Sequence, residues 1–303
     1  MRTFTQLRMR AQELGPKRVG LVVADEEAAL RAVESAAKLN IAIPMLFGDE
    51  ARIRRMIQDL GAQALLERAV FVTAQDSIGA THAALRMARN GEVDLVLKGH
   101  LRTDELLRAV LDKQNGIRQG RLLSDVLLYE DTLSGARRLV GITDGGINVA
   151  PSCDEKAQII QDAVAVMRAI GIVRPKIALM SATEVVSESV PSTLDAEILT
   201  ERGAGNEFGE CDVFGPLALD NALLESAATA KGITSRVAGR ADCMVVPNIE
   251  AGNLLGKAVK YLAGSQCAHV VVGAKVPILI PSRVESADDK LNSIALGVVV
   301  SVA

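Results

Sequence analysis

Aromatic side chains are nearly absent from this sequence. Phe, Tyr and Trp make up 2% of its 303 residues, and there is no tryptophan. The cores must therefore be filled by Ala, Val, Leu and Ile, as suits parallel sheets flanked by helices. Apolar residues still reach 49% and charged residues 23%, which is the balance of a globular protein. A chain of this length has room for two domains.

Cysteine is also scarce, and the sequence has no excess of positive charge. The four cysteines are far apart, form no CxxC pair and have no histidine at ligand spacing: Cys153, Cys211, Cys243 and Cys267. This spacing excludes a disulfide framework and a zinc site and indicates buried thiols in a reducing compartment. The net charge of −3 and the lack of a basic run argue against a nucleic-acid partner. We expect no metal.

The N-terminus lacks the apolar core of a signal peptide, and the C-terminal apolar run is about half the length that spans a bilayer. We therefore expect a cytoplasmic protein with no membrane partner. No G-x-G-x-x-G motif follows the early strands, so a dinucleotide site is not indicated.

Strand-like and helix-like patterns alternate along the whole chain, which predicts an α/β fold with a largely parallel sheet. The strand Val93 to Leu97 runs into Lys98-Gly99-His100, and a helix from Thr103 to Leu111 carries Arg108. Open α/β sheets bind ligands at the carboxyl ends of their strands, which makes Lys98, His100 and Arg108 candidates. A solvated surface cation or histidine is the alternative for each. The pattern changes between Asn115 and Asp144, where we place the crossing to a second domain.

Three glycine-containing turns follow later strands. Asp144 begins a glycine-rich turn, Asp220 follows Gly215-Pro216-Leu217-Ala218-Leu219, and Asn248 precedes Gly252-Asn253. Such turns let backbone approach a ligand closely. Tight turns with Asp or Asn as helix caps remain the alternative.

The stretch from Ala274 to Lys290 combines several signals. An apolar run, Val276 to Ile280, predicts a short buried strand that delivers Ser282 and Arg283 onto a turn. Ser286 and Asp289 then form an [ST]-x-x-[DE] box before a helical pattern. Arginine presents a planar fork of donors suited to phosphate, and a helix N-terminus favours an anion. A plain helix cap is the alternative for the Ser286–Asp289 box.

Five separated motifs resemble those of the phosphate acetyl/butyryltransferase family, in the expected order. Ser282-Arg283 with Ser286 and Asp289 resembles its S-R-x-x-S-x-x-D signature, and the continuation from Lys290 to Leu296 is closer to the butyryltransferases. Similar matches begin at Asp144, at Gly215 and at Pro247, although Phe214 stands where the family usually has Asp.

This resemblance implies a two-domain, three-layer α/β/α fold of the isocitrate/isopropylmalate dehydrogenase kind. The first domain would comprise residues 1–138 and 272–303 and the second residues 139–271, with the active site in the cleft between them. The implied reaction moves a short-chain acyl group, butyryl or acetyl, between coenzyme A and phosphate. Coenzyme A is then a substrate, no cofactor is tightly bound, and a homodimer or higher homo-oligomer is expected.

The resemblance also implies roles for residues. Asp289 would be the general base for the thiol, with Asp288 and Asp220 as alternatives, because many butyryltransferase-like sequences lack an acid at the position of Asp289. Arg283 would hold phosphate, and Ser282 would donate to the oxyanion. Substrate binding would fall to Lys98, Arg108, Asp144, Asp220, Asn248, Gly252 and Asn253. A phosphate acetyltransferase, or a non-catalytic protein that binds coenzyme A or acyl phosphate, are the alternative functions; a decarboxylating dehydrogenase would need a metal-binding aspartate set that we do not find.

Overall fold

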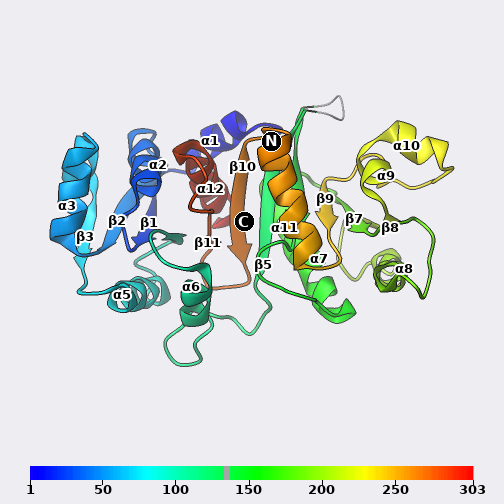
Figure 1. Ribbon diagram of the computed structural model, residues 1–303, viewed down its shortest axis with the longest axis horizontal. Coiled ribbons are helices and arrows are strands. Elements are labelled where there is room, and N and C mark those ends of the chain that lie inside the picture. Colours follow the sequence, from blue (N-terminus) through cyan, green and yellow to red (C-terminus); the bar gives the residue numbers. More distant parts are fainter. Residues whose placement is uncertain (133–136, 303) are drawn as a thin grey trace. The chain divides into compact units, whose positions relative to one another are not determined.

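The computed structural model describes residues 1–132 and 137–302 (Figure 1). By its internal contacts the chain divides into two compact α/β units. Unit I comprises residues 5–121 and 268–302, and unit II comprises residues 1–4 and 122–267. The sequence patterns placed the crossing between Asn115 and Asp144, and the resemblance implied a boundary after residue 138; the contacts divide the chain between Arg121 and Leu122. The reason is that β5 (Ser124–Asp131) and β6 (Arg138–Thr143) pair antiparallel within unit II.

Unit I holds a six-stranded sheet in the order β3-β2-β1-β4-β11-β10. All neighbours are parallel except β10 and β11. Its strands are β1 (Lys17–Val22), β2 (Ala42–Gly48), β3 (Val70–Thr73), β4 (Leu95–Lys98), β10 (Cys267–Val272) and β11 (Ile278–Leu279). Its helices are α1 (Phe4–Glu13), α2 (Glu27–Lys38), α3 (Glu50–Asp59), α4 (Gln63–Arg68), α5 (Ser77–Arg89), α6 (Thr103–Val110) and α12 (Ala287–Val300).

The core of unit I lies between these strands and helices. Buried aliphatic side chains such as Leu21, Val96 and Val33 fill it, as the scarcity of aromatic residues predicted. Helix α12 packs beside α2 (Figure 1). It approaches the sheet at Gly297, where a Cβ atom would lie 2.6 Å from Leu95 Cδ2. Because glycine has no Cβ atom, α12 and the sheet can approach closely at this position.

Unit II holds a five-stranded sheet in the order β5-β6-β9-β7-β8, in which only β5 is antiparallel to its neighbour. Its further strands are β7 (Lys176–Met180), β8 (Asp212–Leu217) and β9 (Cys243–Val245). Its helices are α7 (Cys153–Ala169), α8 (Pro191–Ala204), α9 (Leu219–Leu223), α10 (Glu225–Ala230), α11 (Ile249–Lys257) and the π-helix η1 (Ala258–Leu262). Leu127, Val140, Ala178 and Met244 belong to its apolar core.

Two strand boundaries differ from the expected ones. Strand β11 covers only Ile278–Leu279 of the predicted run from Val276 to Ile280, and β8 includes Gly215, Pro216 and Leu217, which were expected to lie in a turn after the strand. Strand β8 is the edge strand of unit II, so Pro216 can lie in it without removing an N–H that an inner strand would need. None of the helices in the described part of the chain has the length and apolar composition needed to cross a bilayer.

Candidate functional site

Three neighbouring parallel strands of unit I end at one edge of its sheet: β1, β4 and β11. Lys98 is the last residue of β4, Glu26 follows β1, and Ser282 follows β11. The boundary between β1 and β4 is the point where the strand order reverses, since β2 lies on one side of β1 and β4 on the other. Ligands bind at such switch points in open α/β sheets. The sheet topology therefore gathers these side chains where a ligand is expected.

Arg283 lies on the turn between β11 and α12 and is exposed. Within the described ranges 1–132 and 137–302, its guanidinium has no ion pair or hydrogen bond to another residue. Its positive charge is near enough to Lys98 to lower the pKa of that ammonium group. An uncompensated guanidinium beside a second cation favours an anionic ligand.

Lys98 is 3% exposed, and the contacts of its Nζ within the described part of the chain are long, 3.5 Å to the Gly99 carbonyl and 3.4 Å to the Leu101 carbonyl. Burial lowers its pKa first of all, and the charges of Lys290 and Arg283 lower it further, while Glu26 acts in the opposite direction. An ammonium group has three donors, so an anion at this edge would complete the hydrogen bonding of Lys98.

Asp289 is 1% exposed and closes the first turn of α12. Its Oδ2 accepts hydrogen bonds from the Ser286 hydroxyl at 2.5 Å and from the Ser286 N–H at 3.3 Å, and its own N–H donates to Ser286 Oγ at 3.2 Å. The helix-cap interpretation of this box is therefore confirmed. The carboxylate lies six residues after Arg283, in the same unit.

Two further ionic side chains at this edge, the partly buried Glu26 and the buried Glu285, were not among the predicted site residues. Glu26 is the residue before α2, and Glu285 lies in the turn that carries Arg283. The Lys290 ammonium is 2.9 Å from Glu26 Oε1, and His269 Nε2 is 3.5 Å from Glu285 Oε1. Burial alone would raise the pKa of Glu285, but His269 and Lys290 outweigh it and lower that pKa. The signal that could have found Glu26 is its place directly before α2, in the short loop that follows β1.

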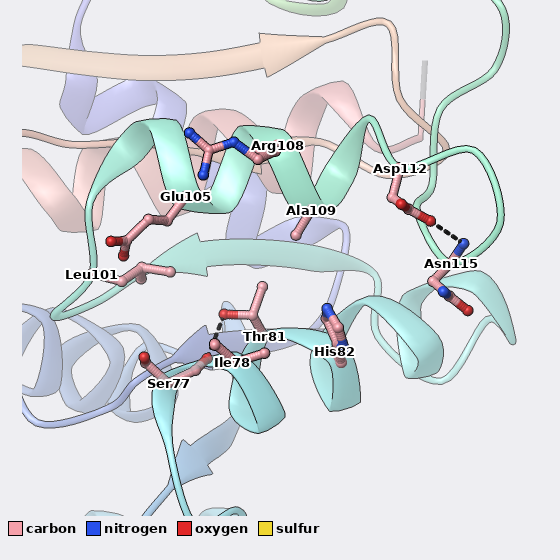
Figure 2. Close-up of a pocket in the computed structure, with 10 residues that line it drawn as sticks. All are labelled: Ser77, Ile78, Thr81, His82, Leu101, Glu105, Arg108, Ala109, Asp112 and Asn115. Atoms are coloured by element: carbon pink, nitrogen blue, oxygen red, sulfur yellow. Dashed lines mark hydrogen bonds between the residues drawn. The ribbon is translucent and has the colours of Figure 1, made fainter.

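Arg108 lies on α6 and lines a separate cavity of about 470 Å³ between α5 and α6 (Figure 2). It is 77% exposed and is 3.6 Å from Asp104 in an i,i+4 pair. Figure 2 shows Thr81 and His82 on α5 and Glu105 and Ala109 on α6 around this cavity. His100 instead contacts Asp25, with 3.2 Å between Nδ1 and Oδ1.

The predicted residues of unit II follow strands β6, β9 and β8, which are parallel members of one sheet. Asp144 comes directly after β6 and is 2% exposed. Its Oδ1 accepts from the N–H groups of Gly146 and Ile147 at 2.8 and 2.9 Å, and its Oδ2 accepts from Asn148 Nδ2 at 2.6 Å. Burial, followed by the charge of Asp125, raises the pKa of Asp144 to about 6.

Asn248 begins α11, and its Oδ1 accepts from the Ala251 N–H at 2.9 Å, so it caps this helix. Gly252, one turn on, packs against the Asp144 turn: a Cβ atom on it would lie 2.6 Å from Gly145 Cα. Asn253 is exposed, and its Nδ2 donates to the Gly145 carbonyl at 3.4 Å. The structure thus brings Asp144, Gly252 and Asn253 together through the turn at Gly145.

The two alternative bases are both exposed. Asp220, in the first turn of α9, is 3.6 Å from the Lys231 ammonium. Asp288 is 3.2 Å from the Arg8 guanidinium. In the described part of the chain, no group of three or more His, Cys, Asp or Glu side chains is arranged to hold a metal ion.

Comparison with known proteins identifies a family. A family model described as "Phosphate acetyl/butaryl transferase" matches residues 64–298. The chain is 36% identical to the phosphate butyryltransferase of Clostridium beijerinckii over 300 residues, covering 99% of this chain and 98% of the relative. It is 34% identical to the phosphate acetyltransferase of Thermotoga maritima over 283 residues, covering 93% and 95%.

The fold of a solved relative agrees with these matches. The branched-chain phosphotransacylase from Enterococcus faecalis V583 superimposes with a TM-score of 0.81 at 26% identity, covering 94% of this chain and 99% of that one. The predicted fold class, two α/β/α domains, is confirmed.

Proposed function

Because the chain belongs to the phosphate acetyl/butaryl transferase family, we propose that it moves a short-chain acyl group between coenzyme A and inorganic phosphate. The reaction is acyl-CoA + phosphate = acyl phosphate + CoA. The observation that carries the proposal is the exposed Arg283, which has no partner among the described residues and whose charge helps to lower the pKa of the buried Lys98. Both side chains would bind the phosphate or phosphoryl group.

The proposed chemistry toward acyl-CoA begins at the thiol of coenzyme A. Asp289 accepts the thiol proton, since the pKa of an ordinary thiol is about 8.5 and the thiolate is the nucleophile. The sulfur attacks the acyl carbon, a C–S bond forms, and the C–O bond to phosphate breaks. Ser282 donates a hydrogen bond to the oxyanion that develops on the carbonyl. Arg283 neutralises the phosphate as it leaves, and the proton passes from Asp289 to solvent.

The remaining predicted residues are proposed to bind substrate: Lys98, Arg108, Asp144, Asp220, Asn248, Gly252 and Asn253. Coenzyme A is a substrate in this proposal and no cofactor is tightly bound. Four free cysteines support a reducing, cytoplasmic setting. A butyryl-like chain is favoured over acetyl because the continuation after Asp289 is closer to the butyryltransferases. One methylene in an apolar pocket changes kcat/KM by only about 10–200-fold, so acetyl-CoA remains a slower substrate.

The direct test is release of free thiol from butyryl-CoA and from acetyl-CoA, with and without phosphate. We expect release only when phosphate is present, with the higher kcat/KM for butyryl-CoA. A wide preference for acetyl-CoA would replace the butyryl assignment with the acetyl one. Binding of coenzyme A without turnover of either thioester would instead support the non-catalytic alternative.

Arg283→Ala tests the phosphate clamp itself. Loss of a charge-assisted contact made in both ground and transition states should raise KM for phosphate and lower kcat. Arg55→Ala is the matched control, because Arg55 is also an exposed arginine of unit I but lies on α3. Equal values of kcat and of KM for phosphate in the two variants would show that Arg283 does not bind phosphate.

A further inference from the structure

Lys290 is a lysine with no exposed surface, in the first turns of α12. Its Nζ donates to the Ser282 carbonyl at 2.8 Å and lies 2.9 Å from Glu26 Oε1. Because the side chain is fully buried, Lys290 itself is closed to a ligand. What it contacts, however, is the backbone of the turn that carries Arg283.

This turn is held from both of its ends. The Ser282 carbonyl also accepts from the Glu285 N–H at 3.1 Å, and the Glu285 carboxylate, itself 7% exposed, is paired with His269 of β10. Between these two buried anchors, Arg283 is exposed and Val284 is 73% exposed. The exposed residues Arg283 and Val284 are therefore flanked by residues whose ionic contacts fix the turn to the rest of unit I.

Burying an ammonium group is unfavourable unless it is paired, and an apolar side chain of the same size often fills such a place at least as well. Stability alone therefore does not account for Lys290. What the ammonium group adds over a methionine is a directed hydrogen bond to the Ser282 carbonyl. It thereby couples the end of β11 to Glu26 at the start of α2.

We propose that Lys290 is a positioning residue that, together with Glu26, holds the Ser282–Arg283 turn in the geometry that receives phosphate. The inference rests on the proposed function, because it concerns the phosphate contact of that same site. Displacements of about 1 Å in a reacting group can lower rates by 10²-fold, so a loosened turn should be measurable.

The first variant is Lys290→Met, which keeps the unbranched apolar part of the side chain and removes the ammonium group. We expect KM for phosphate to rise by roughly 10–100-fold, with KM for coenzyme A within about threefold of the wild type. This variant also leaves the Glu26 carboxylate buried without its cation, which by itself destabilises the fold.

The deciding variant is therefore the double substitution Lys290→Met/Glu26→Gln. Glu26→Gln removes the uncompensated charge, so thermal stability should recover toward that of the wild type. The Ser282 carbonyl still lacks its ammonium donor, so KM for phosphate should stay raised. Glu26→Gln alone controls for the loss of negative charge near Lys98. If the double variant regained both the thermal stability and the phosphate KM of the wild type, the inference would be overturned.

Lys156→Met is the matched control in unit II. Lys156 is 7% exposed on α7, and its ammonium is 2.6 Å from Asp195, so it is a second buried lysine paired with a carboxylate. Lys156→Met should lower stability without a selective rise in the phosphate KM. The same selective rise in Lys156→Met would also overturn the inference.

Calorimetric titration with inorganic phosphate separates this inference from the proposed function. A wild type that binds phosphate but transfers no acyl group would refute the proposed function. The Kd of the double variant would still decide the inference: a value about tenfold weaker or more supports it, and a value within about threefold of the wild type refutes it. A wild type that binds no phosphate would refute the inference as well.

Discussion

Asp289 combines two roles at the scale of a single residue. Its Oδ2 completes the cap of α12 through Ser286, and it is the proposed acceptor of the thiol proton. Asparagine can replace aspartate in a cap, because its carbonyl oxygen accepts the same hydrogen bonds, but it is not a base. Substitution therefore separates the two roles.

We expect Asp289→Asn to lower kcat by roughly 10²–10⁴-fold with little change in KM. The defect should shrink as the pH rises toward about 8.5, where the thiol ionises without help. Glu155→Gln is the control, since Glu155 occupies the same position of the Ser152 capping box at the start of α7. Wild-type kcat for Asp289→Asn across the pH range would remove Asp289 from the mechanism and leave Asp288 or Asp220 as the base.

Asp144 makes stability depend on pH. Its folded-state pKa, about 6, is above the value of 3.8 for a free aspartate, so the folded state holds a proton more tightly than the unfolded state does. The stabilisation from this group is therefore fully present below pH 4 and is lost as the pH rises through 6. The shift corresponds to at most about 3 kcal/mol.

The measurement is the thermal midpoint of wild type and Asp144→Asn between pH 4 and 7. The wild type should have the higher thermal midpoint at pH 4, and the difference between the two midpoints should decrease as the pH rises. Asp94→Asn is the contrasting case, because the hydrogen bond from Arg18 lowers the pKa of Asp94 below its ordinary value of 3.8. The contribution of Asp94 should therefore stay nearly constant from pH 4 to 7 and be lost only as the pH falls further. An Asp144→Asn difference that does not change with pH would contradict the assignment.

At the scale of elements, the contact of α11 with the Asp144 turn depends on glycine. A Cβ on Gly252 would lie 2.6 Å from Gly145 Cα and 2.9 Å from the Asp144 carbonyl, both of which are backbone atoms that move only with the turn. The same glycine was predicted from the sequence as a substrate-binding residue. The close packing of Gly252 against the Asp144 turn by itself requires a glycine at this position, whether or not a ligand is bound.

Gly252→Ala should therefore destabilise the protein by about 1–3 kcal/mol, the usual cost of overpacking. Gly256→Ala is the control in the same helix, where a Cβ would meet only the flexible end of Leu127 at 3.2 Å. Urea unfolding of both variants makes the comparison. Equal stability of the two variants would show that the turn at Gly145 adjusts freely.

At the scale of the whole molecule, we expect self-association. Large apolar side chains remain exposed, among them Leu254 at 70% and Leu262 at 88%, and the resemblance to the family implied a homo-oligomer. Light scattering at micromolar concentration should give at least the mass of a dimer, twice 32.0 kDa. A stable monomer of 32.0 kDa at that concentration would contradict the expectation.

The sequence by itself determined the alternation of strands and helices, the aliphatic cores and the family. These properties follow from local periodicity and from short motifs, which the chain carries whether or not it is folded. Arg283 and the Ser286–Asp289 box could be found in this way, because they are close together along the chain.

Only the tertiary structure decided which distant residues meet. Glu26 and Lys290 are separated by most of the chain, and the packing of α12 against α2 brings them together. Long-range contacts, burial and the resulting pKa values of Lys98 and Asp144 depend on strand order, which local patterns do not encode. The same reason explains why the sequence indicated a ligand at Gly252, whereas the structure shows a close contact of α11 with the backbone of the Asp144 turn.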